Sequence, residues 1–405
     1  MSDWKLHTPA GVNDILPGEY RLREKVISAV GEVFRRMCYE PLEAPTFEFY
    51  DVYNGQGGQI SQETMFKFFD DKGRILVLRP DMTTSIARIF ATKTASRPLP
   101  QRYSYVGSVF RAEQTQGARQ REFTQMGVEL IGSDRPEADA EVIIAAVEAI
   151  KAAGISEFQV EIGQVAFFSG LAAQAGLDAD DIEKLRARID AKDTWGMAEL
   201  TKKLDLDEDV KELMISLPYL FGGEEVFAKA RVPGLNRTSL AALDSLGRVY
   251  SILKTCGYEE YISIDLGMLQ GIDYYTGLIF KCYTHGVGFP ICAGGRYDNL
   301  TAGFGQPAGA VGFAMGINRI ISVLKNKTDK PERTGFAVWG EYGAERAAYR
   351  FAEKKRGEGV PAEILFGCES AASARIAACE RGRKYLAVID SDGREDITLL
   401  EEDVQ

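Results

Sequence analysis

Apolar residues in the first part of the chain follow two different spacings. In residues 19–39 they recur every three or four positions, as on one face of an amphipathic helix, and Pro41 is expected to end it. The short apolar runs 65–69 and 75–78 flank a polar turn that contains a glycine, which predicts a β-hairpin. Two longer strands joined by a polar loop, and then a helix, are expected at 102–111, 123–130 and 138–153.

The middle of the chain changes character. Residues 165–257 follow a helical pattern that differs from both neighbours, so we interpret them as a helical insertion. Strands then resume, followed by a helix, at 261–266, 278–283, 289–293, 308–313 and 315–324. The pattern predicts an α+β domain over residues 1–325.

A polar, proline-containing stretch at 325–334 has the composition of a linker. Beyond it, strands and helices alternate, which predicts a small α/β domain over residues 334–405. The expected strands and helices are 335–339, 345–355, 362–366, 370–381 and 385–389. The last segment, 390–405, is rich in aspartate and glutamate and is a poor surface for an RNA backbone.

Composition narrows the function. The net charge of -11 counts mildly against tRNA binding. We expect a cytoplasmic protein with no membrane span, because no apolar run approaches about 20 residues and no leader pattern opens the chain. The six cysteines form no CxxC pair, and the two histidines, His7 and His285, are far apart. We therefore expect no metal site and no cofactor.

Two segments carry polar groups suited to a small ligand. Asp81 can accept hydrogen bonds from an ammonium group and Thr83 offers a hydroxyl, although a turn with an Asx-type local bond explains the same pattern. Strand alternation places Gln125 and Glu129 on one face, and Arg111 precedes them on the neighbouring strand. These side chains build either the floor of a polar pocket or a solvated outer face with ion pairs.

Two later segments combine glycine with aromatic or basic residues. Tyr274 and Tyr275 stand between glycines, as a rigid aromatic wall or as core packing. The paired glycines of 293–298 permit close approach of the backbone to a ligand. Arg319 begins a helix behind a glycine-rich strand, where it either faces that ligand or lies on the surface. The sequence contains no P-loop and no dinucleotide fingerprint.

In this order, the segments resemble class II aminoacyl-tRNA synthetases, specifically the histidyl enzyme. Residues 11–17 resemble its N-terminal signature, the first helix with Pro45 resembles the dimer-forming motif 1, and 110–123 and 316–319 resemble motifs 2 and 3. The resemblance implies an antiparallel sheet flanked by helices, in a dimer. By matching position it also implies a histidine pocket made of Asp81, Thr83, Arg111, Gln125, Glu129, Tyr274 and Tyr275.

The departures from that family concern catalysis. Gln270 stands where the synthetases carry an arginine that faces the α-phosphate of ATP, and losing such a charge commonly costs ~3 kcal/mol in the barrier. The motif 2 loop lacks the family's first arginine and its proline. Arg119 and Arg319 remain as candidates for a residual nucleotide pocket. Residues 334–405 have room only for a reduced anticodon-binding domain.

A histidine pocket without its activation parts resembles the synthetase-like regulatory subunits of short-form ATP phosphoribosyltransferases. That resemblance implies a non-catalytic chain that binds free L-histidine and mediates feedback inhibition in the first step of histidine biosynthesis. It also implies a short catalytic subunit as partner and a homodimer within a hetero-oligomer. Three alternatives remain: an active histidyl-tRNA synthetase, a paralogue that modifies a protein or senses uncharged tRNA, and a scaffold with a vestigial pocket.

Overall fold

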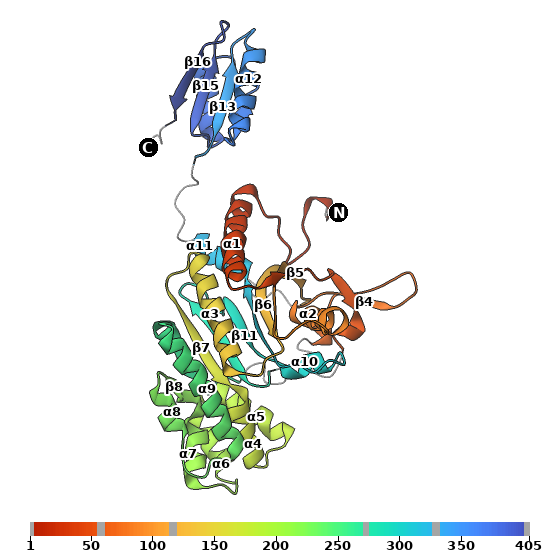
Figure 1. The fold of residues 1–405 in the computed structure, drawn as a ribbon, viewed down its shortest axis with the longest axis vertical. Helices are drawn as coiled ribbons and strands as arrows, with labels where there is room; N and C mark the ends of the chain where they lie inside the picture. The colour runs from red at the N-terminus through yellow and green to blue at the C-terminus, as the bar shows by residue number, and fades with distance from the viewer. Residues whose placement is uncertain (1–3, 55–60, 113–119, 270–274, 326–332, 401–405) are drawn as a thin grey trace. The chain divides into compact units, whose positions relative to one another are not determined.

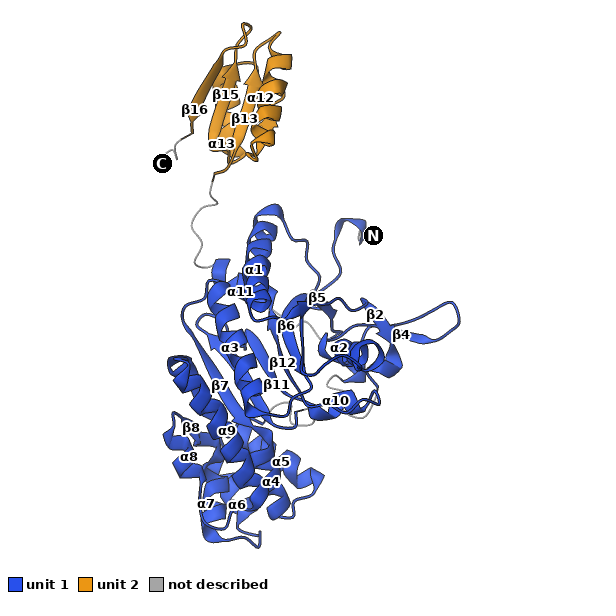
Figure 2. Ribbon diagram, viewed as in Figure 1, with its two compact units in different colours: residues 1–326 blue, residues 327–405 orange. Residues whose placement is uncertain are grey.

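The computed structural model describes residues 4–54, 61–112, 120–269, 275–325 and 333–400 (Figure 1). The chain separates into two compact units, residues 1–326 and 327–405 (Figure 2). Among the described residues, no helix is both long and apolar enough to cross a membrane.

A nine-stranded sheet forms the centre of the first unit, in the order β1-β5-β6-β12-β11-β10-β7-β9-β8. The strands from β5 to β7 in this order pair antiparallel, and the parallel pairs are β1 with β5 and β7 with β9. The strands are β1 (Glu40–Pro41), β5 (Gln101–Phe110), β6 (Glu122–Ile131), β7 (Phe158–Gln164), β8 (Phe221–Gly222), β9 (Ile262–Asp265), β10 (Leu278–Thr284), β11 (Cys292–Arg296) and β12 (Ala310–Gly316).

Helices cover one face of this sheet and bury most of the core there (Figure 1). The alternation of side chains along β6 explains which face is buried, since Met126, Val128 and Leu130 all join that core. A smaller cluster on the opposite face packs Met82 and Ile86 against Tyr105. The helices of the first face are α1 (Pro17–Arg36), α3 (Pro136–Ala152), α9 (Arg237–Thr255) and α11 (Ile317–Lys325), and those of the second are α2 (Thr83–Ile89), η4 (Phe90–Thr94) and α10 (Asp298–Ala302).

The predicted hairpin is confirmed and belongs to a separate three-stranded sheet, in the order β2-β4-β3. Its strands are β2 (Phe47–Phe49), β3 (Lys67–Phe69) and β4 (Ile75–Leu78). Phe47, Phe49 and Phe69 are exposed on it. Short 3-10 turns elsewhere in this unit are η1 (Trp4–Leu6), η2 (Tyr50–Val52), η3 (Gln62–Thr64), η5 (Leu217–Tyr219) and η6 (Glu259–Tyr261).

The run of helices predicted over 165–257 is present. Aspartate or asparagine side chains accept from the first backbone N–H groups of several of them, as Asp178, Asp193 and Asn236 do. The short strand β8 interrupts the run and pairs with β9 at the edge of the large sheet. The helices before α9 are α4 (Val165–Gln174), α5 (Ala179–Asp190), α6 (Thr194–Thr201), α7 (Glu208–Ser216) and α8 (Glu225–Ala230).

The second unit is a four-stranded sheet in the order β14-β13-β15-β16, with a helix on each face. Its elements are β13 (Phe336–Gly340), α12 (Glu345–Gly357), β14 (Ala362–Ile364), α13 (Ala371–Glu380), β15 (Tyr385–Ile389) and β16 (Glu395–Leu399). The first three strands are parallel, and β16 pairs antiparallel with β15.

Two details of the sequence interpretation were wrong. The first helix ends at Arg36, before Pro41, because Cys38 turns the chain with a positive φ of 62°. The strand expected at 289–293 begins only at Cys292. Beyond the elements expected from the sequence, the acidic segment after residue 390 contains β16, an exposed strand that pairs with β15 at the edge of the sheet.

Candidate functional site

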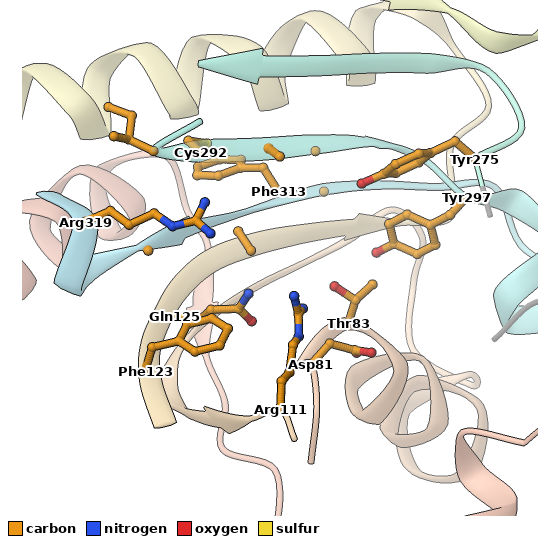
Figure 3. A pocket seen from close by; sticks show the side chains of 16 residues that line it. Asp81, Thr83, Arg111, Phe123, Gln125, Tyr275, Cys292, Tyr297, Phe313 and Arg319 are labelled. Carbon is orange, nitrogen blue, oxygen red and sulfur yellow. The ribbon is translucent and has the colours of Figure 1, made fainter. Parts of the chain in front are cut away.

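A cavity of about 200 Å³ lies on the face of the large sheet opposite α1 and α3. Its walls come from the start of α2, the end of β5, and strands β6, β11 and β12 (Figure 3). Tyr275 and Tyr297 lie at one end and Arg319 at the other, with Arg111 pointing in between them. Drug-sized ligands occupy roughly 300–1,000 Å³, so this volume suits a smaller molecule of amino-acid size.

Small residues make the floor of the cavity flat. In the sheet register, Glu129 lies opposite Gly312, and Gly312 lies opposite Gly295. A Cβ atom on Gly312 would overlap the carboxylate of Glu129. On Gly295 it would stand 2.7 Å from the ring of Tyr275. The glycines are therefore needed so that these two side chains can lie against the sheet.

Glu129 is a buried carboxyl group held by hydroxyls. Its side chain is 1% exposed, and it accepts a hydrogen bond from Thr83 Oγ1 at 2.7 Å and another from the hydroxyl of Tyr297. No ion pair to it is found among the described residues. Burial raises the pKa of Glu129 to about 8, with a further rise from Asp81, although the hydroxyls of Tyr297 and Thr83 act in the opposite direction.

Asp81 forms a local hydrogen-bonded turn and also faces the cavity. Its carboxylate accepts from the backbone N–H of Thr84 at 2.8 Å and from the Thr84 hydroxyl at 3.2 Å, which is the Asx-type local bond. The same side chain lines the cavity. Burial raises the pKa of Asp81, and the nearby charge of Arg111 opposes that rise. Asp81 therefore gives the cavity an acidic group, and Glu129 is hydrogen-bonded to Thr83 and Tyr297, which line it.

Two arginines give the cavity its basic groups. Arg111 donates from Nε to the carbonyl oxygen of Pro80 at 3.1 Å, and its guanidinium lies 5.4 Å from the ring centroid of Phe123. Arg319 donates to the carbonyl oxygen of Pro290 at 2.5 Å and lies over the ring of Phe289. A zwitterion, with one positive and one negative group, matches a cavity that offers both a carboxylate and guanidinium groups.

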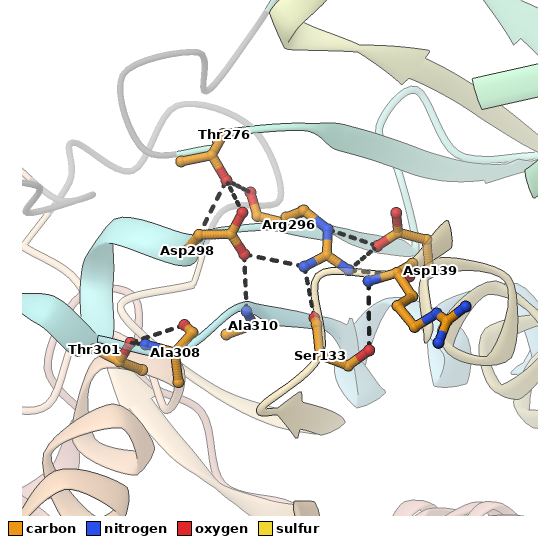
Figure 4. Close-up of polar contacts among 9 residues, drawn as sticks. Ser133, Asp139, Thr276, Arg296, Asp298, Thr301, Ala308 and Ala310 are labelled. Atoms are coloured by element: carbon orange, nitrogen blue, oxygen red, sulfur yellow. Dashed lines mark hydrogen bonds and ion pairs between the residues drawn. The ribbon is translucent and has the colours of Figure 1, made fainter. Parts of the chain in front are cut away.

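A network of ion pairs and hydrogen bonds joins the residues next to the two tyrosines in the chain (Figure 4). Arg296 forms an ion pair with Asp139 at 2.7 Å and another with Asp298 at 3.0 Å. Asp298 in turn accepts from the hydroxyl of Thr276 at 3.1 Å. Because Thr276 follows Tyr275 and Arg296 precedes Tyr297, the network fixes both aromatic residues. Burial raises the pKa of Asp139 to about 6 against the pull of Arg296.

The structure brings together most of the residues expected at the site. Those that line the cavity are Asp81, Thr83, Arg111, Gln125, Tyr275 and Arg319. Glu129 is not part of the lining itself but is hydrogen-bonded to Thr83 and Tyr297, which are. Tyr274, Gln270 and Arg119 lie outside the described residues.

Tyr297 and Phe123 line the cavity but were not predicted as ligand contacts. The signal for Tyr297 was its position directly after the Gly-Gly-Arg segment of β11, whereas nothing local distinguished Phe123 from a core residue. No group of three or more histidine, cysteine, aspartate or glutamate side chains could hold a metal ion in the part of the chain that the structure describes.

The model of the histidyl-tRNA synthetase family matches residues 11–320. Histidyl-tRNA synthetase from Nostoc sp. has the same fold, with a TM-score of 0.80 at 20% identity over 97% of this chain and 96% of that one. The expected α+β class and synthetase-like sheet are therefore confirmed, and the chain is a class II synthetase-like protein.

Relatives over nearly the full length carry a more specific name. The chain is 43% identical over 399 residues to the ATP phosphoribosyltransferase regulatory subunit of Acetivibrio thermocellus, covering 98% of this chain and 95% of the relative. The crystal structure of an ATP phosphoribosyltransferase regulatory subunit/histidyl-tRNA synthetase from Bacillus halodurans has a TM-score of 0.83 at 31% identity, over 95% of this chain and 98% of that one. The chain belongs to the histidyl-tRNA synthetase-like family of ATP phosphoribosyltransferase regulatory subunits.

Proposed function

We propose that this protein is a non-catalytic regulatory subunit that binds free L-histidine in the cavity and transmits that binding to an ATP phosphoribosyltransferase catalytic subunit. The observation that carries the proposal is an amino-acid-sized cavity that presents both acidic and basic side chains. The names of the relatives support the regulatory role. We also expect a cytoplasmic location.

The chemistry of histidine fits the groups available. Its ammonium and its imidazole N–H need acceptors, which Asp81 and Glu129 provide. Its carboxylate needs a donor, which Arg111 or Gln125 provides. The imidazole ring needs a wall of apolar or aromatic surface, and Tyr275 supplies a ring of that kind.

The non-catalytic part of the proposal rests on Gln270. Adenylate formation brings a carboxylate onto the α-phosphate of ATP, and negative charge builds up as the bond forms. A neutral amide cannot stabilise that charge as the synthetase arginine does. Histidine binding without activation is the result we expect.

We propose a homodimer of this chain within a hetero-oligomer that contains short catalytic subunits. Support comes from the exposed phenylalanines of the β2-β4-β3 sheet, where Phe47, Phe49 and Phe69 are 53%, 44% and 72% exposed. This sheet follows the segment that resembles the dimer-forming motif 1. Exposed aromatic groups that gather on one sheet are typical of protein interfaces.

Calorimetry with L-histidine tests the ligand. We expect saturable binding by the full chain, weakened in Arg111→Met and unchanged in Arg97→Met, whose exposed side chain pairs only at 3.9 Å with Glu40. Histidinol lacks the carboxylate and should lose affinity for the wild type, with little further loss in Arg111→Met. Absence of heat at millimolar histidine contradicts the proposal.

Reconstitution with a short ATP phosphoribosyltransferase tests the regulation. Histidine should inhibit the mixture, and Arg111→Met should shift that inhibition to higher histidine concentrations. By reciprocity, ligands of the partner must change histidine affinity by the same factor, typically 1–3 kcal/mol of coupling. A catalytic subunit that behaves identically with and without this chain excludes the regulatory role.

A second candidate is an active histidyl-tRNA synthetase. The observation in its favour is that Arg111 and Arg319 both line the cavity. Histidine-dependent exchange between pyrophosphate and ATP distinguishes the two functions. Exchange well above background would establish the synthetase, whereas histidine binding without exchange favours the regulatory subunit.

A further inference from the structure

The second unit contains an open crevice of about 700 Å³ that is independent of the histidine pocket. It lies outside the carboxyl ends of β13 and β14, between the loop that leads to α12 and the loop that leads to α13. These helices cover opposite faces of the sheet, because Val338 packs with α12 and its neighbour Ala337 packs with α13. The loops that follow β13 and β14 therefore leave the sheet toward opposite faces, and the crevice lies between them.

Aromatic side chains surround this crevice. Tyr342 is 99% exposed and Phe366 is 73% exposed, and Tyr349 adds a third aromatic group from α12. Trp339 completes the wall, and its indole N–H donates to the carbonyl oxygen of Cys368 at 3.1 Å, which fixes the ring. Large aromatic groups on one exposed wall are typical of binding sites and not of solvated loops.

The charged groups of the crevice are all acidic. Glu341, Glu345 and Glu369 line it, and no lysine or arginine does so in this described part of the chain. Glu345 accepts only a backbone N–H, that of Gly343 at 3.2 Å. The arginines of α12 nearest to Glu345, Arg346 and Arg350, are exposed outside the lining. The crevice therefore repels phosphate groups and attracts cations.

We propose that this crevice docks a protein partner through an arginine side chain of that partner. A guanidinium group is planar, so it stacks on the faces of tyrosine, phenylalanine and tryptophan. Its fork of N–H donors also matches a carboxylate in a bidentate pair. The crevice offers aromatic faces and carboxylates in one place, and neither suits the negatively charged backbone of RNA.

Trp339 provides a local reporter in the full chain. Trp4 and Trp195 are 80% and 76% exposed, so Trp4→Phe and Trp195→Phe leave Trp339 as the one indole. The probe is acetyl-Gly-Arg-Gly-amide, and its neutral isostere is the same peptide with citrulline. We expect a saturable change of Trp339 emission with the arginine peptide, weakened by salt, and little change with the citrulline peptide.

The second part of the test removes negative charge from the crevice. In Glu341→Gln/Glu369→Gln, the affinity for the arginine peptide should fall about 10-fold or more, since each tenfold step requires only about 1.4 kcal/mol. The matched control is Glu353→Gln/Glu380→Gln, which removes two exposed carboxylates of the same unit outside the crevice and should bind normally. Calorimetry on the unsubstituted chain repeats the comparison without the tryptophan variants.

Three outcomes overturn the proposal. The first is equal binding of the citrulline peptide, which would mean that the glutamates do not recognise charge. The second is absence of any response to the arginine peptide at high millimolar concentration in both measurements. The third is binding of a tRNA anticodon stem-loop that shields Trp339 from solvent, which would make the crevice an RNA site. Arg111→Met should leave peptide binding intact, so this test is separable from that of histidine binding.

Discussion

Two buried carboxyl groups in the first unit have opposite surroundings. Asp139 is 3% exposed and forms an ion pair with Arg296 at 2.7 Å. Glu129 is 1% exposed and is held by the hydroxyls of Thr83 and Tyr297. The first charge is compensated within the protein, whereas the second is compensated only by neutral donors, and burial raises the pKa of Glu129 to about 8.

This difference separates a structural network from a ligand site. A buried ion pair is complete, so breaking it leaves an orphan charge and destabilises the fold. A buried carboxyl group without a cation is poised to accept a charged or N–H donor from a ligand. Arg296 and Tyr297 are neighbours in the chain, yet Arg296 belongs to the ion-pair network and Tyr297 donates to the uncompensated Glu129.

The largest expected effect comes from breaking the compensated pair. Arg296→Met leaves Asp139 buried without its cation, so the free energy of unfolding should fall by about 3–5 kcal/mol. Denaturant unfolding measures this, with Arg135→Met as the control because its ion pair to Glu137 is exposed. A loss below about 1 kcal/mol would mean that the Arg296 network is not the main structural support of Tyr275 and Tyr297.

The pH dependence of stability isolates Glu129. Its pKa rises from 4.5 in the unfolded chain to about 8 in the folded one, so between these values the folded state binds more protons. Stability therefore falls as pH rises from 5 to 8, with each pKa unit worth about 1.4 kcal/mol.

Glu129→Gln should remove that slope, while the contribution of Asp139 is common to both proteins and cancels. Unfolding at pH 5, 6.5 and 8 gives the comparison. Between pH 5 and pH 8, the free energy of unfolding should fall by a few kcal/mol more in the wild type than in the variant. Parallel curves for wild type and variant would show that Glu129 is not protonated in the free protein.

The same substitution should weaken histidine binding. Glu129→Gln removes the carboxyl group that, once it loses its proton, can accept a charge-assisted hydrogen bond from the ligand, and such bonds contribute about 1.5–3 kcal/mol, so the affinity should fall roughly 10- to 100-fold. Calorimetry measures it, with Glu141→Gln as the control, since Glu141 pairs with Arg102 outside the cavity. Unchanged affinity would remove Glu129 from the proposed pocket.

The smallest effect is expected from one hydroxyl. Tyr297→Phe removes one of the donors to Glu129, so the free energy of unfolding should fall by about 0.5–1.5 kcal/mol at pH 8. It should fall less at pH 5, where the carboxyl group is protonated and needs that donor less. Tyr219→Phe, whose exposed hydroxyl donates at 3.4 Å, is the control for loss of a phenol oxygen.

Much of the fold could be predicted because its signals are local. The helical spacing of Val26, Val30 and Val33 predicts the buried face of α1, and the alternation of Met126, Val128 and Leu130 predicts which face of β6 joins the core. β16 was not predicted because its acidic, exposed sequence carries no strand pattern. A strand of this kind depends on pairing with β15, which no local pattern encodes.

The candidate site was predicted in part, for a related reason. Residue type and order indicated Asp81, Thr83, Arg111 and Gln125, and the structure brings them to one cavity. Tyr297 needed the fold, because its partner Glu129 is 168 residues away in the chain.

By itself, the sequence determined most of the helices and strands, the acidic character of the chain and the set of polar groups available for a ligand. Only the tertiary structure decided which carboxyl group is compensated and which is not, and which glutamates and aromatic residues meet in the crevice of the second unit. The physical reason is that desolvation and charge compensation depend on neighbours brought from distant parts of the chain, whereas periodicity depends only on neighbours along it.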